Sequence, residues 1–87
     1  MKTKEENLQI TVYSKERCVQ CTATIRNLSR LEVYHTIEHA DNLPKDVAAL
    51  GYLQAPIVTV RNEDGAITDS WYGYNPGKIE EYAAVAV

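Results

Sequence analysis

Two cysteines separated by two residues, Cys18 and Cys21, are the residues whose type and spacing most directly suggest chemistry. A Cys-x-x-Cys pair can supply half of a zinc site, or it can be a dithiol that exchanges electrons with a disulfide. It can also be two inert cysteines that fill part of a core. The elements that position the pair must distinguish these three interpretations.

The zinc interpretation depends on two histidines, because Cys18, Cys21, His35 and His39 follow the spacing Cys-x2-Cys-x13-His-x3-His. In a zinc finger both histidines lie on a helix, about 6 Å apart. Residues 33–40 instead have the β-branched and aromatic composition of a strand. Four residues along a strand span about 13 Å, too far for two nitrogens to bind one metal ion at about 2 Å. We therefore expect no metal site and two strand histidines that are at least partly exposed.

The hydrophobic pattern predicts the element order β-α-β-α-β-β-α. The leading β-α-β unit requires a parallel pair of strands, and the closing β-β unit is a hairpin, so we expect an α/β fold with a four-stranded mixed sheet flanked by three helices. Residues 1–7 are predicted to be a flexible N-terminal tail, and residues 8–87 a single domain. The predicted strands are 8–13, 33–40, 56–60 and 66–72, and the predicted helices are 18–31, 44–53 and 75–87, the second ending at Gly51 and the third capped by Asn75.

The composition excludes several classes of protein. A chain of 87 residues with 45% apolar content predicts one small domain. A net charge of −3 without clustered Lys and Arg argues against nucleic-acid binding. No run approaches the roughly 20 apolar residues of a membrane span, and the N-terminus lacks the pattern of a signal peptide, so we expect a cytoplasmic protein. In that compartment a close cysteine pair is more often catalytic or metal-binding than a permanent bridge.

The predicted helix assigns different roles to the two cysteines. Cys18 lies at the helix start, where free N–H groups and the positive end of the helix dipole stabilise a thiolate, so we expect its pKa to fall. Cys21 belongs to an apolar stripe with Ile25, Leu28 and Leu31, and it should point into the core. The pattern therefore favours a dithiol with Cys18 as the nucleophile and Cys21 as the resolving thiol.

From Tyr13 onward the chain resembles the NrdH-type redoxins, which are glutaredoxin-like proteins of the thioredoxin superfamily. The resemblance is carried by YSKERCVQC at 13–21, LGYLQAPIV at 50–58 and WYGYNP at 71–76. It implies a thioredoxin fold with sheet order 2-1-3-4. The implied redox motif is Cys18, Val19, Gln20 and Cys21, and the implied partner groove contains Lys15, Ala55, Pro56 with a cis peptide bond, Trp71, Gly73 and Tyr74. Tyr72 and Asn75 depart from the usual serine and arginine of the family.

The resemblance also implies a function. A redoxin of this type binds no cofactor and uses a Cys18–Cys21 disulfide to donate electrons to the large subunit of class Ib ribonucleotide reductase. Thioredoxin reductase reduces it in turn, so NADPH acts only indirectly, and we expect a monomer. Glutaredoxins hold glutathione with acidic residues that follow a Gly-Gly turn, and the corresponding segment here, YGYNPGK, has no acidic pair. A glutathione-dependent glutaredoxin and a non-catalytic zinc-binding module remain open as alternatives.

Overall fold

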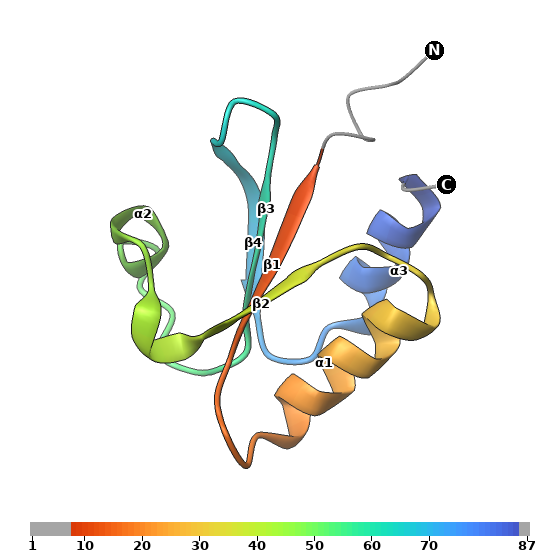
Figure 1. The fold of residues 1–87 in the computed structure, drawn as a ribbon, viewed down its shortest axis with the longest axis horizontal. Coiled ribbons are helices and arrows are strands. Elements are labelled where there is room, and N and C mark those ends of the chain that lie inside the picture. Colours follow the sequence, from red (N-terminus) through yellow and green to blue (C-terminus); the bar gives the residue numbers. More distant parts are fainter. Residues whose placement is uncertain (1–7, 86–87) are drawn as a thin grey trace.

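The computed structural model in Figure 1 describes residues 8–85, so the predicted tail at 1–7 lies outside the described residues. Its elements follow the predicted order, with one additional 3₁₀ helix at Ala40–Asn42. They are β1 (Gln9–Ser14), α1 (Val19–Arg30), β2 (Thr36–His39), α2 (Lys45–Ala48), β3 (Ile57–Arg61), β4 (Ile67–Tyr72) and α3 (Pro76–Val85). None of the helices within 8–85 has the length and apolar character needed to cross a membrane.

The four strands form one sheet in the order β2-β1-β3-β4, which confirms the predicted topology. β1 pairs with β2 in parallel and with β3 antiparallel, and β3 and β4 form an antiparallel hairpin. Ile57, the first residue of β3, pairs with Tyr13 near the end of β1 and with Tyr72 at the end of β4. The register therefore brings the loop after β1, the loop before β3 and the loop after β4 to the same end of the sheet.

The helices cover both faces of the sheet, α1 and α3 on one side and α2 on the other (Figure 1). Alternation along the strands supplies a core to each side, since Val12 and Val58 face α1 and α3 while Tyr13 and Ile57 face α2. The larger core contains Ile10, Val12, Leu28, Val33, Val58, Val60, Trp71 and Ile79, and the smaller one contains Tyr13, Val47 and Ile57.

A β-bulge in β4 changes the face to which its side chains point. Val60 pairs with Asp69 while the next residue of β3, Arg61, pairs with Ile67, so Thr68 is an extra residue. Ile67 packs against the core on the α2 side, whereas Trp71 belongs to the core on the α1 and α3 side. The bulge therefore determines which side chains of β4 are buried beneath α3.

Two predicted elements are shorter than expected. The strand predicted at 33–40 begins only at Thr36, because Glu32 and Val33 still belong to the C-terminal cap of α1. Glu32 lies in the left-handed region at φ 60°, and the Val33 N–H donates to the Leu28 carbonyl at 2.9 Å. The helix predicted at 44–53 ends at Ala48, because the N–H groups of Leu50 and Gly51 bond three residues back, to Val47 at 3.1 Å and to Ala48 at 3.2 Å. The first difference lies outside the end of the sheet where the three loops meet, whereas the second makes residues 49–53 part of the loop before β3 at that end.

Candidate redox site

The two cysteines form a disulfide at the N-terminus of α1. Their Cα atoms lie 5.2 Å apart, about one helical turn. β1 ends at Ser14, and Arg17 turns the chain in the left-handed region at φ 58° before Cys18 takes an extended conformation as the helix N-cap. The predicted strand, loop and helix thus place the pair where the sequence indicated.

The two sulfur atoms have different surroundings, as the helical stripe predicted. Cys21 is buried with 1% of its surface exposed, and it lies on the same face of α1 as the buried Leu28. Cys18 is half-buried and adjoins Val19, which is 84% exposed. Cys18 is therefore the cysteine that a large substrate can reach.

A backbone N–H group in the first turn of α1 faces the Cys18 sulfur. The Cys21 N–H donates to Cys18 Sγ at 3.1 Å. The same end of the helix carries the positive end of the helix dipole. Both interactions stabilise negative charge on Cys18 Sγ, and a thiolate is the reactive form in disulfide exchange.

The loop before β3 lies directly against the disulfide. The carbonyl oxygen of Ala55 is 3.8 Å from Cys18 Sγ. The Ala55–Pro56 peptide bond is cis, as the resemblance implied, and the buried Pro56 accepts a hydrogen bond from the Gly73 N–H at 2.9 Å. The structure therefore brings together Cys18, Ala55, Pro56 and Gly73 from three separate loops.

Gln20 joins the redox motif to the loop after β4. Its Oε1 accepts a hydrogen bond from the Tyr74 N–H at 3.0 Å. Gly73 allows this approach, because it has φ +77° and a Cβ there would lie 3.0 Å from Gln20 Oε1. Sequence reasoning placed Gln20 in the redox motif but missed this contact, since nothing local in the sequence pairs residues 54 positions apart.

Known proteins resemble the chain in sequence and in structure. No family model matches it. The glutaredoxin-like protein NrdH of Escherichia coli K12 is 31% identical over 75 residues, covering 83% of this chain and 85% of the relative, and NrdH of Shigella flexneri matches equally. The chain belongs to the NrdH family. It is therefore a thiol–disulfide oxidoreductase of the glutaredoxin-like type, with a redox-active cysteine pair.

Solved structures confirm the thioredoxin fold of this NrdH-type chain. NrdH-redoxin from E. coli, described by its thioredoxin-like activity profile, has a TM-score of 0.66 at 32% identity, covering 84% of this chain and 92% of that one. Thioredoxin from Fasciola hepatica has a TM-score of 0.71 at 17% identity, covering 94% of this chain and 83% of that one. The second likeness concerns the fold alone.

Trp71 does not line the groove of this NrdH-type chain, which corrects the sequence-based prediction. It is 6% exposed, belongs to the larger core and stacks on Tyr82 with ring centroids 5.9 Å apart. Trp71 pairs with Val58, whose side chain faces α1 and α3, so the Trp71 ring enters the same core. Tyr74, by contrast, is 41% exposed beside Gln20, and it remains a candidate for partner contact.

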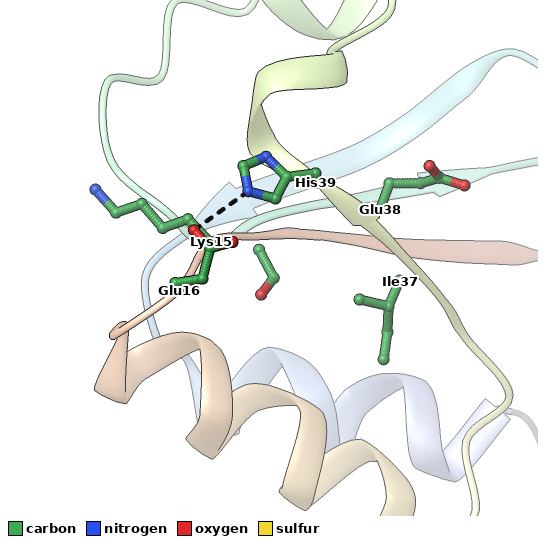
Figure 2. Close-up of a pocket in the computed structure, with 6 residues that line it drawn as sticks. Lys15, Glu16, Ile37, Glu38 and His39 are labelled. Carbon is green, nitrogen blue, oxygen red and sulfur yellow. Dashed lines mark ion pairs between the residues drawn. The ribbon is translucent and has the colours of Figure 1, made fainter.

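Lys15, the remaining predicted groove residue, lies at the rim of an open hollow of about 300 Å³ between the end of β1 and β2. Figure 2 shows the hollow with Lys15, Glu16, Ile37 and His39 around it, and with an ion pair between His39 Nε2 and Glu16 Oε1 at 3.6 Å.

The histidines of the zinc template have other partners. His35 precedes β2, where its Nδ1 lies 2.8 Å from the Val33 carbonyl oxygen, and so it is not a strand residue as predicted. His39 ends β2, and its Nδ1 accepts a hydrogen bond from the Asp41 N–H at 3.1 Å. Across residues 8–85, no group of three or more His, Cys, Asp or Glu side chains is arranged to hold a metal ion.

Proposed function

We propose that this chain is a cytoplasmic, monomeric dithiol carrier that donates electrons to class Ib ribonucleotide reductase and is reduced by thioredoxin reductase with NADPH. The supporting observation is the half-buried Cys18 among exposed apolar side chains. Val19 is 84% exposed, Leu53 is 96% exposed and Tyr74 is 41% exposed. Val19 follows Cys18 in the chain, Leu53 lies two residues before Ala55, and the Tyr74 backbone is hydrogen-bonded to Gln20. Such a surface suits a protein partner better than the small, charged glutathione.

A second hollow beside the loop before β3 supports a protein client. It has a volume of about 240 Å³ and is lined by Gly51, Tyr52, Leu53, Gln54 and Tyr72. An extended client segment that pairs with the Ala55 backbone can place a side chain there, as in other cases where a peptide adds to an exposed backbone edge. The segment after β4 has no carboxylate between Gly73 and Lys78 that could bind the glutathione ammonium group.

The proposed reaction transfers two electrons from the dithiol to the client. The Cys18 thiolate attacks one sulfur of the client disulfide, and the other client sulfur leaves as a thiolate that takes up a proton. Cys21 loses its proton and attacks Cys18 Sγ, which expels the second client thiolate and forms the Cys18–Cys21 disulfide of the structure. Because Cys21 is held one turn away, this second step is intramolecular and outcompetes thiols from solution.

The electron source is tested by supplying one reducing system at a time. We expect turnover of a disulfide substrate with NADPH and thioredoxin reductase, and little with glutathione, glutathione reductase and NADPH. Activity confined to the glutathione system would instead support the glutaredoxin alternative. Stoichiometric zinc in the purified protein, without reductase activity, would support the metal-binding module. The client is tested by adding class Ib ribonucleotide reductase and measuring deoxyribonucleotide formation.

A further inference from the structure

A groove lined by two arginines runs along α1, away from the disulfide. It has a volume of about 220 Å³ and is lined by Ala23, Arg26, Asn27 and Arg30 of α1 and by Tyr74 from the loop after β4. We refer to these five residues as the arginine groove. No acidic side chain lines it, although the whole chain carries a net charge of −3. Its positive charge is therefore local.

The two guanidinium groups are available to a ligand. Arg26 and Arg30 are exposed, and residues four apart on a helix lie about 6 Å from each other on one face. Neither forms an ion pair with any residue in the range 8–85. Arg30 Nη2 donates to Asn27 Oδ1 at 2.6 Å, which holds the guanidinium at the groove. Carboxylates are suitable ligands, because the planar fork of N–H donors matches their geometry.

Tyr74 makes the groove continuous with the redox site. Its backbone N–H donates to Gln20, between the cysteines, and its hydroxyl accepts a hydrogen bond from Asn27 Nδ2 at 3.4 Å. Figure 1 shows the connection from β4 to α3 passing beside α1. A segment that leaves Cys18 along Tyr74 therefore arrives at the arginines.

The length of such a segment follows from the helix. Arg26 and Arg30 lie eight and twelve residues after Cys18, so they are about 12 Å and 18 Å along the axis. An extended peptide advances about 3.3 Å per residue. Residues roughly four and six positions from the reacting client cysteine would reach the two guanidiniums.

We propose that the arginine groove binds an acidic segment of the client protein, with carboxylates about four and six residues from the cysteine that reacts with Cys18. This inference rests on the proposed function, since it requires a client that is a protein disulfide. Two carboxylates match the two guanidiniums. A nucleic acid would bring many further phosphates against a chain whose net charge is −3.

The test uses synthetic disulfide peptides that carry Glu, Gln or Lys at these two positions. The protein is reduced in advance, and a single turnover is followed after acid quenching, so that no recycling enzyme is needed. We expect the Glu peptide to be reduced roughly three- to tenfold faster than the Gln peptide at low salt, as two exposed charge pairs allow. The difference should shrink in 0.5 M NaCl, because exposed charges are screened there.

Variants of the two arginines test whether the arginine groove causes the preference for the Glu peptide. Arg26→Gln with Arg30→Gln should bring the Glu-to-Gln rate ratio close to one, and Arg26→Glu with Arg30→Glu should favour the Lys peptide. The matched control is Lys45→Gln, an exposed residue of α2 that removes a positive charge elsewhere and should keep the wild-type ratio. Equal rates for the Glu and Gln peptides with the wild-type protein would overturn the proposal, as would a preference that survives both arginine variants.

The outcome is distinguishable from failure of the proposed function. If all peptides are reduced at equal rates, the proposal of an acidic client segment is refuted, while the proposed function as a protein-disulfide reductant stands. If no peptide is reduced and glutathione mixed disulfides are turned over, both the proposed function and the proposal of an acidic client segment are refuted. Circular dichroism of each arginine variant shows whether a lost preference comes from unfolding.

Discussion

Two polar clusters tie helices to the region of β4, and they are built differently. Beside the disulfide, Gln20 and Asn27 contact Tyr74 through neutral hydrogen bonds of 3.0 and 3.4 Å. Under α3, Asp69 accepts hydrogen bonds from Lys78 Nζ at 2.6 Å and from the Tyr82 hydroxyl at 2.7 Å. We call the second set, Asp69, Lys78 and Tyr82, the anchor cluster.

The electrostatics of the anchor cluster show that it contributes to stability. Burial of Asp69 opposes ionisation, but hydrogen bonds from Lys78 and Tyr82 outweigh it and lower the pKa of the carboxyl. The hydrogen bond to Asp69 raises the pKa of Lys78, and burial followed by the same partner raises the pKa of Tyr82. Lys78 also lies 5.7 Å from the centre of the buried Trp71 ring. The loop beside the redox site is thus held by weak, neutral hydrogen bonds, whereas α3 is held on the sheet by charged ones.

The largest effect expected at the redox site comes from its two sulfur atoms. Cys18→Ser should reduce turnover to the uncatalysed background, because a serine hydroxyl does not replace a thiolate in disulfide exchange. Cys21→Ser should trap a mixed disulfide between Cys18 and the client, visible by non-reducing electrophoresis and mass spectrometry. If Cys18→Ser traps the client and Cys21→Ser does not, the assignment of nucleophile and resolving thiol is reversed.

The order of helices and strands and the position of the cysteine pair were predictable because their signals are local, whereas the sheet order was implied by the resemblance. Alternation predicted β1, and the stripe that includes Leu28 predicted α1 and the burial of Cys21. That Ile67 and Trp71 lie on opposite faces of β4 was not predictable, because simple alternation puts them on one face and Thr68 is an extra residue in the pairing of β3 and β4. The late start of β2 was missed as well, since Glu32, just beyond the end of α1, adopts a left-handed conformation that usually signals glycine.

The anchor cluster should affect stability and leave redox chemistry unchanged. Asp69→Asn removes the charge from two short hydrogen bonds, so we expect the free energy of unfolding to fall by about 1–2 kcal/mol. Urea denaturation with an unchanged m-value measures this loss. The rate of client reduction per folded molecule should stay at the wild-type value. A large loss of rate in folded Asp69→Asn would mean that the two clusters are coupled.

The anchor cluster also predicts how stability depends on acid. The folded pKa of Asp69 lies below its ordinary value of 3.8, so the unfolded chain binds protons first as the pH falls. The contribution of Asp69 is fully present above about pH 5, and it is lost as the pH falls through 3.8 and then through the lower folded value. Unfolding free energies measured from pH 6 to pH 2 should therefore fall less steeply in Asp69→Asn. Asp64→Asn, in the exposed turn between β3 and β4, should keep the wild-type slope.

The smallest effect is expected at Gln20, whose substitution tests the neutral hydrogen bonds beside the redox site. Gln20→Met keeps the approximate length of the side chain but removes the acceptor of the Tyr74 N–H. A single neutral hydrogen bond contributes about 1 kcal/mol, so amide exchange at Tyr74 should accelerate by roughly five- to tenfold. The KM for a protein disulfide should rise more than kcat falls, because the loop positions the client while Cys18 and Cys21 carry the reaction. Gln9→Met, at an exposed position of β1, is the matched control. Unchanged exchange at Tyr74 in Gln20→Met would show that the loop is held without Gln20, by its backbone bond to Pro56 and by Asn27.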